Sequence, residues 1–189
     1  MIALIILLVV IVAVAIWYVA TYNGLINLKT HADESWSQID VQLQRRNDLI
    51  PNLLATVKGY SKYEKKTLEE VTQLRQQIVN LPAGDHQKLM EVSDKLSGAL
   101  NSLYAVAENY PDLKASAEYS KLMEELSNTE NKIAYSRQLY NSVVANFNAK
   151  IQNFPANLVA KKHHFTALDY LQVPQEAKAA PQVSFDDLD

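Results

Sequence analysis

Cysteine is absent from this chain, glycine and proline are scarce, and neither sign of charge is in large excess. Without cysteine there is no disulfide, no thiolate metal site, no cysteine nucleophile and no lipoprotein anchor. The 4 glycines and 6 prolines in 189 residues supply little of the turn chemistry that a multi-stranded sheet needs. The 18 basic residues nearly balance 21 acidic ones, whereas a nucleic-acid-binding protein usually has a basic face. We therefore expect one domain of long helices and no nucleic-acid partner.

Motifs that carry chemistry are also missing from the sequence. It contains no glycine-rich phosphate loop, no zinc-binding HExxH and no nucleophile elbow. Adjacent His163 and His164 point in two directions on a helix, which makes them a poor metal site. A di-iron bundle needs Glu-x-x-His motifs on its inner faces, and the sequence has none. We predict a non-enzymatic protein with no catalytic residue, no metal and no cofactor.

The most conspicuous feature present is an uncharged apolar run at residues 2–20. At 1.5 Å per residue, a helix of this length crosses about 30 Å of hydrocarbon. Trp17, Tyr18 and Tyr22 gather at its far end, as aromatic side chains do at a membrane–water interface. We expect residues 1–22 to be a single-pass transmembrane anchor, with residues 2–20 in the lipid bilayer.

A cleaved signal peptide is the alternative interpretation of this run, because residues 13–15 (AVA) have the small-x-small pattern of a cleavage site. No basic side chain precedes the run, however, and its apolar character continues through Val19, which favours a retained anchor. Lys29, Arg45 and Arg46 follow the run, so the bias of positive charge favours a bundle on the cytoplasmic side of the membrane.

Residues 36–60 organise the remainder of the chain. Their apolar positions keep a 3-4 spacing that lines one helix face: Trp36, Ile39, Leu43, Ile50, Leu53, Val57 and Tyr60. Arg46 interrupts this face, and Pro51 follows it, which predicts a kink. Arg46 either extends its head group out of the seam or forms a buried ion pair with Glu125 or Glu130 on a facing helix.

Four amphipathic segments predict an antiparallel up-and-down four-helix bundle with long helices over residues 23–172. The expected helices are residues 25–58, a second from residue 61 with a capping box at 61–64, residues 86–109 and residues 113–153. Residues 22–24 (YNG) are a joint after the span or a frayed turn. The expected inward residues of the later helices are Thr67, Val71, Leu74, Ile78; Leu89, Val92, Leu96, Ala99, Leu103, Val106; and Tyr119, Leu122, Leu126, Thr129, Ile133, Ser136, Tyr140, Val143, Phe147.

The periodic pattern weakens after Phe154 and Pro155. Apolar residues between 158 and 171 either pack back on the bundle or lie on the membrane surface. Residues 173–189 carry the whole net charge of −3, because Lys178 is outnumbered by four acidic residues. This composition predicts a disordered acidic tail, with a short docking motif around Phe185 as the alternative.

Several motifs resemble those of the LemA family of bacterial membrane proteins. They are WSQIDVQL at 36–43, RRNDLIPNL at 45–53, VKGY at 57–60, ENYPDLKA at 108–115, TENKIA at 129–134, RQLYN at 137–141 and NFP at 153–155, together with YN at 22–23. They occur in the family's order over about residues 22–171. The segment KKHHF at 161–165 departs from the pattern, since relatives are more apolar there and have a glycine before the phenylalanine.

The resemblance implies one N-terminal membrane helix, a four-helix bundle, no established enzymatic activity and an association with membrane-bound scaffolding. The polar residues that recur in the family correspond to Arg45, Arg46, Asp48, Glu108, Glu130 and Arg137. We interpret them as a structural charge network that holds the bundle in register. If Arg46 and Glu130 form a truly buried pair, removing Arg46 alone is expected to cost roughly 3–5 kcal/mol.

Two functions are compatible with these observations. The first is a membrane-anchored scaffold or adaptor of the cell envelope that binds other membrane or envelope proteins through its coiled-coil-like bundle, with homo-oligomers as one form of assembly. The second is a bundle that senses a ligand or peptide and relays a signal through the anchor, with the Pro51 kink as its hinge. The absence of a converging polar set outside the seam favours the scaffold.

Overall fold

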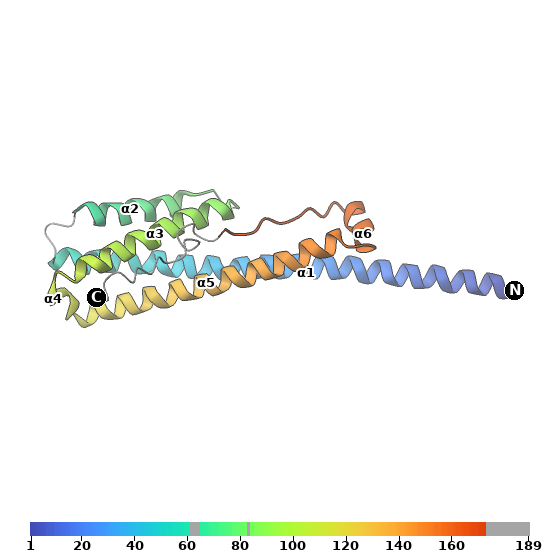
Figure 1. The fold of residues 1–189 in the computed structure, drawn as a ribbon, viewed down its shortest axis with the longest axis horizontal. Coiled ribbons are helices and arrows are strands. Elements are labelled where there is room, and N and C mark those ends of the chain that lie inside the picture. Colours follow the sequence, from blue (N-terminus) through green and yellow to red (C-terminus); the bar gives the residue numbers. More distant parts are fainter. Residues whose placement is uncertain (61–64, 83, 173–189) are drawn as a thin grey trace, which may run out of the picture. The chain divides into compact units, whose positions relative to one another are not determined.

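The computed structural model describes residues 1–60, 65–82 and 84–172, and every regular element in these ranges is a helix. In chain order the helices are α1 (Ile2–Tyr60), α2 (Lys65–Asn80), α3 (His86–Ala107), α4 (Pro111–Lys114), α5 (Ala117–Gln152) and α6 (Ala156–Lys162) (Figure 1). The predicted all-α class with a long apolar N-terminal helix is confirmed. The expected capping box at 61–64 and the acidic tail at 173–189 lie outside the described residues.

Helix α1 is continuous over 59 residues and includes the apolar run. Residues 22–24 are neither a joint nor a frayed turn, because the helix passes through them. A single glycine inside a helix costs only about 1 kcal/mol relative to alanine, which the flanking helical residues readily offset. Every side chain from Met1 to Trp17 is exposed, and this end of α1 is long and apolar enough to cross a membrane.

The chain divides into two compact units, to which both α1 and α5 contribute. The first unit contains residues 1–46 and 127–170. In it, Trp36 packs edge-on against Tyr140, with ring centroids 6.2 Å apart, and Arg46 binds Glu130. The second pair lies ten residues further along α1 and ten residues back along α5, so the two helices run antiparallel with a fixed register.

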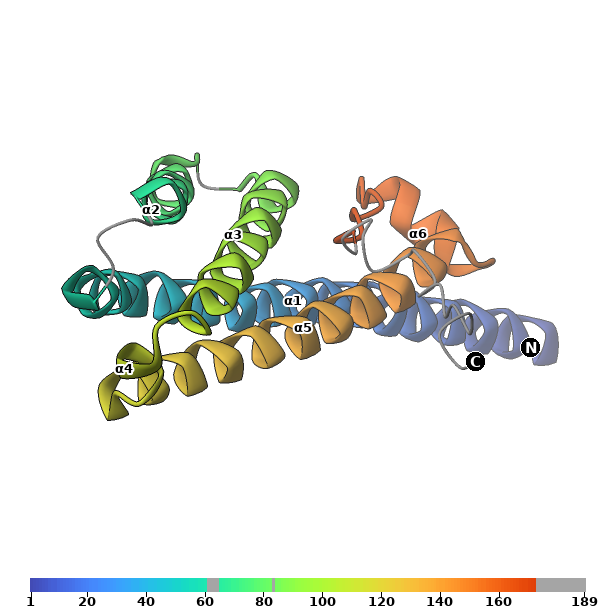
Figure 2. The same ribbon diagram turned by 60° about the vertical axis from the view of Figure 1, so that its left-hand side comes forward.

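The second unit contains residues 47–126 together with 171 and 172 of the described chain. Its helical segments share one apolar core, whose fully buried members include Ile50, Val57, Val71, Leu96 and Leu113. Helices α2 and α3 lie side by side in both views (Figures 1 and 2). The packing of four amphipathic segments that the sequence predicts is therefore found in this unit.

The observed core follows the predicted stripes with small shifts in phase. Leu68, Met90 and Val144 are buried, whereas their neighbours Thr67, Leu89 and Val143 are only half-buried. Two short helices were not predicted. Helix α4 begins at Pro111, whose fixed backbone angle suits the first helical position, and it ends before α5 begins at Ala117. Helix α6 follows Pro155.

Pro51 lies inside α1 and creates one unfilled position in its hydrogen-bond ladder. Because proline has no backbone N–H, the carbonyl of Asn47, four residues earlier, loses its helical donor. The Nε of Arg75 on α2 donates to this carbonyl at 3.1 Å. The gap that Pro51 opens is thus closed by a side chain from the neighbouring helix, which ties α2 to α1 at one point. The kink itself stays a prediction.

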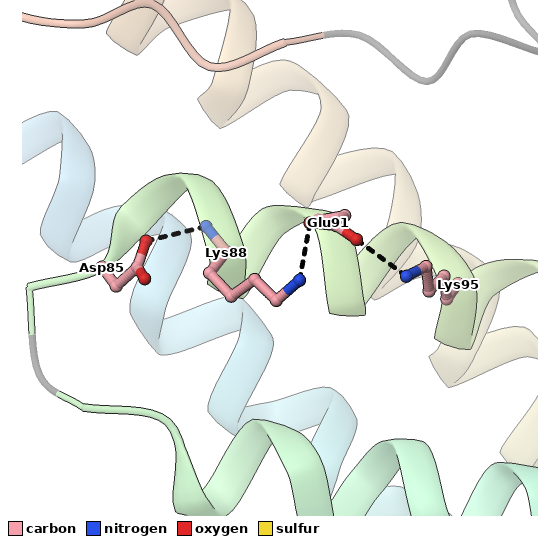
Figure 3. Close-up of polar contacts among 4 residues, drawn as sticks. All are labelled: Asp85, Lys88, Glu91 and Lys95. Atoms are coloured by element: carbon pink, nitrogen blue, oxygen red, sulfur yellow. Dashed lines mark hydrogen bonds and ion pairs between the residues drawn. The ribbon is translucent and has the colours of Figure 1, made fainter.

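Helix α3 begins with a chain of exposed polar contacts (Figure 3). The carboxylate of Asp85 accepts a hydrogen bond from the backbone N–H of Lys88 at 3.0 Å, which caps the helix. Glu91 accepts hydrogen bonds from Lys95 at 2.7 Å and from Lys88 at 2.9 Å. These bonds lower the pKa of Glu91 to about 2, with the Lys95 bond contributing most. Solvent screens such exposed pairs, so they contribute little to stability.

The contact at the proline predicts a coupling between Arg75 and Pro51. Arg75→Met should destabilise the full chain by about 1–2 kcal/mol, because the Asn47 carbonyl loses its charged donor. In a Pro51→Ala background the same substitution should cost less, since the backbone N–H of the introduced alanine then reaches that carbonyl. Urea unfolding of the detergent-solubilised chain, followed by circular dichroism, measures both values. Lys95→Met, at an exposed pair, is the control, and an equal cost of Arg75→Met in both backgrounds would contradict the coupling.

Candidate functional site

A charged pair lies in the apolar seam of the first unit. The side chain of Arg46 is 1% exposed, and its Nη1 donates to Oε2 of Glu130 on α5. Of the two carboxylates that the sequence offered as partners, the structure thus places Glu130 against Arg46. Ile39, Leu43 and Ile133, all buried, line the same seam. A guanidinium among these side chains is stabilised only where its donors meet acceptors, so the pair fixes which residues of α1 and α5 face each other.

Polar side chains occupy other buried positions on α5. Thr129, Ser136 and Arg137 are all at most 9% exposed. Further along the same helix, Tyr140 donates to the backbone carbonyl of Asp169 at 3.4 Å. Burial raises the pKa of Tyr140, and the nearby charges of Asp33 and Asp169 add to this shift. The seam between α1 and α5 is therefore unusually polar for a helix interface.

The remaining residues of the predicted charge network are placed differently. Arg45 is exposed on α1, and Arg137 is buried on α5, both in the first unit. Asp48 and Glu108 belong to the second unit. The Glu108 carboxylate forms an exposed ion pair with Lys114 at 2.6 Å, which closes the turn around α4. The structure joins Arg46 to Glu130, and a wider network stays a prediction.

An open groove lies beside this seam, between α1 and α5. It has a volume of about 330 Å³ and is lined by Val41 and Gln42 of α1 and by Lys132, Tyr135 and Ser136 of α5, among others. Val41 is 62% exposed and Tyr135 is 69% exposed, so two large apolar side chains face solvent there. The Oε1 of Gln42 is buried and accepts no hydrogen bond. The groove thus exposes apolar surface beside a basic side chain, Lys132.

A second groove, in the second unit, has a different character. Its volume is about 490 Å³, and its lining is rich in amide side chains, including Gln73, Gln76 and Gln77 of α2. Within the described parts of the chain, no group of three or more His, Asp or Glu side chains is placed to hold a metal ion. The groove between α1 and α5 is the better candidate for a binding surface, because it exposes apolar side chains.

Sequence reasoning missed this groove for a physical reason. Val41 and Tyr135 lie off the 3-4 stripes of their own helices, so each looks like a single exposed apolar residue, which is common on protein surfaces. They become neighbours of one groove only through the antiparallel register of α1 and α5. The only signal in the sequence was that both residues are large and apolar at positions expected to face solvent.

The fold defines a class of protein: a helical protein whose N-terminal helix, long and apolar enough to cross a membrane, continues into a helical bundle. The model of the LemA family matches residues 35–185, and the chain belongs to the LemA family.

Individual relatives agree with this assignment. The chain is 32% identical over 147 residues to Protein LemA of Metamycoplasma hominis, a match that covers 77% of this chain and 66% of that protein. It is 22% identical to the magnetosome protein MamQ of Magnetospirillum gryphiswaldense, over 79% of this chain and 64% of that protein. It is 23% identical to the magnetosome protein MamQ 2 of Paramagnetospirillum magneticum, over 80% and 64% respectively. The chain thus spans about two thirds of the length of these relatives.

The burial of the charged pair corrects the expected cost of breaking it. The side chain of Glu130 is 46% exposed, so water can solvate its carboxylate when Arg46 is replaced. We expect Arg46→Met to cost about 1 kcal/mol, as for a solvated ion pair. Glu130→Met should cost about 3 kcal/mol, because it leaves a guanidinium buried without that carboxylate. Urea midpoints of the detergent-solubilised full chain measure both.

The double variant Arg46→Met with Glu130→Met serves as the control. It should recover most of the loss caused by Glu130→Met, because two apolar side chains of similar length then fill the seam. If Arg46→Met destabilised the chain more than Glu130→Met, the argument that the buried guanidinium depends more on the pair than the half-exposed carboxylate would be wrong.

Proposed function

We propose that this chain is a non-enzymatic, membrane-anchored scaffold of the bacterial cell envelope that binds another protein in the groove between α1 and α5. The observation that carries this proposal is the exposure of Val41 and Tyr135 on either side of the groove. Val41 lies on the same unbroken helix as the apolar run. A partner bound there would be held by the helix that anchors the chain.

The chemistry of the groove describes the partner segment that fits it. Apolar side chains of the partner would cover Val41 and Tyr135. Lys132, at the same groove, favours an acidic residue in the partner. Helices that carry apolar and acidic residues on one face meet both requirements.

The family relationship supports a role that depends on the membrane. The relatives include magnetosome proteins as well as Protein LemA, and these names do not describe enzymes. We propose that the bundle of this chain lies on the cytoplasmic side of the inner membrane. Lys29 follows the apolar run in sequence, and Lys162 lies 5.8 Å from the ring centroid of Tyr18 at its end, so positive charge gathers at this end.

The groove predicts a site-specific crosslink in native membranes. A photo-crosslinking benzoylphenylalanine at Tyr135 should form one recurrent protein adduct, because that ring lines the binding surface. Val41→Asp should abolish the adduct, since it places a charge in the apolar part of the groove. Val41 is 62% exposed, so this variant should fold normally. Immunoblotting and mass spectrometry of the adduct provide the measurement.

Two matched positions control for exposure alone. Benzoylphenylalanine at Tyr104, which is 53% exposed on α3, should give no adduct of the same mass. Val79→Asp on α2, at a valine of similar exposure to Val41, should leave the Tyr135 adduct intact. An adduct with a second copy of this chain would identify self-assembly as the form of scaffolding. The absence of any adduct dependent on Val41 would contradict the proposal and favour a ligand-sensing bundle.

The proposed orientation predicts which thiols are protected in cells. Because the chain has no cysteine, single Lys66→Cys and Asn101→Cys variants introduce one exposed thiol each, on α2 and α3. A membrane-impermeant maleimide should label neither in intact cells and both after lysis. Labelling in intact cells would place the bundle outside the membrane and make envelope or secreted proteins its partners.

A further inference from the structure

Helix α6 packs against α1 at the end of the apolar run. Val159 and Ala160 of α6 are buried against Leu25 of α1. The hydroxyl of Tyr18 and Nε2 of His163 are hydrogen-bonded at 2.7 Å, and the rings of Tyr22 and His163 lie 4.5 Å apart. The sequence left two positions open for this segment, on the bundle or on the membrane surface. The structure places one face of α6 on α1.

The position of this contact relative to a membrane follows from its place along α1. Tyr18 and Tyr22 lie where the apolar run ends, which is the level at which tyrosine rings occupy a membrane interface. Phe165 packs against both Tyr22 and Phe147, at 6.1 Å between ring centroids in each case, and so holds the end of α6 at this level. In a chain whose α1 crosses a bilayer, α6 therefore lies among the lipid headgroups.

Apolar side chains are exposed at the start of α6 and in the turn that precedes it. Phe154 is 79% exposed and Leu158 is 58% exposed. Phe154 lies in the turn before α6 and Leu158 lies in the first turn of the helix, so both are close to its start. Exposed apolar side chains beside a membrane interface bury their surface in the boundary between headgroups and acyl chains.

Positive charge accompanies these apolar side chains. Lys161, Lys162, His163 and His164 are consecutive and exposed, and residues 154–168 contain no carboxylate side chain. The Nζ of Lys162 lies 5.8 Å from the ring centroid of Tyr18, which fixes its ammonium at the interfacial level. Within the described ranges, no ion pair neutralises Lys161 or Lys162.

We propose that residues 154–164 form a second membrane contact that binds the headgroups of anionic phospholipids, with Phe154 and Leu158 inserted at the boundary and Lys161 and Lys162 on the lipid phosphates. The charge complementarity and the position of α6 at the end of the membrane span select this occupant over a protein. The inference requires the membrane anchor but is independent of the groove between α1 and α5.

The test uses the full chain with one introduced thiol. Leu158→Cys, labelled with an environment-sensitive nitrobenzoxadiazole dye, is reconstituted into vesicles of phosphatidylcholine with increasing fractions of phosphatidylglycerol. The dye emission should shift to the blue as phosphatidylglycerol is added. Lys162→Gln should raise the fraction needed for the half-maximal shift about five-fold, and Lys161→Gln with Lys162→Gln should abolish the response.

Two controls distinguish the outcomes. Lys65→Gln with Lys66→Gln removes the same charge from α2 and should leave the response unchanged. If this pair had the same effect as the pair on α6, the response would depend on net charge and the site would be refuted. Equal dye emission in vesicles with and without phosphatidylglycerol would also overturn the proposal. So would reproduction of the shift by inorganic phosphate in phosphatidylcholine vesicles, because the ligand would then be a soluble anion.

Discussion

The continuity of the backbone hydrogen-bond ladder in α1 is the constraint on which the other features depend. A helix of 59 residues fixes the angular position of every side chain relative to its neighbours. The exposed apolar side chains of the span and the buried stripe that begins near Leu25 therefore belong to one continuous element. Where Pro51 removes a donor, Arg75 supplies another, so the lost bond is replaced from outside the helix. The hydrogen bond from Arg75 therefore completes the ladder of α1 and also fixes the position of α2 against it at this point.

The Arg46–Glu130 pair acts on specificity more than on stability. A seam of leucine and isoleucine tolerates a shift of one helical turn, because each apolar side chain can replace the next. A buried guanidinium does not tolerate this shift, since the carboxylate that accepts its hydrogen bond lies at one position on α5. Thr129 and Ser136, small and polar, make room in the same seam. The register that results is also what brings Val41 and Tyr135 to a common groove.

The sequence predicted the features that depend on local periodicity. The stripes containing Ile39, Ile50, Leu96 and Ile133 are buried as their 3-4 spacing indicated. The features it did not predict depend on contacts between distant segments. The choice of Glu130 over Glu125 needs the register of α5 against α1. Helix α6 has only seven residues, too few for a helix that is stable by itself, and it is held by its packing on Leu25 and by the Tyr18–His163 hydrogen bond. The groove forms only where α1 and α5 pack together, so the pattern of neither helix alone predicts it.

Because α1 and α5 run antiparallel, the groove at Val41 and the basic residues of α6 lie at different positions along α1. Because α5 returns toward Tyr18, the segment that follows it lies beside the end of the apolar run, and this is where the basic residues of α6 occur. Val41 lies 23 residues beyond Tyr18 on α1, about 35 Å at the rise of an α-helix. That distance exceeds the thickness of a headgroup layer, so in a chain whose α1 stands upright in a bilayer the groove would lie clear of the lipid that α6 contacts. This separation supports the proposals of a protein partner for the groove and of lipid for the exposed side chains of α6.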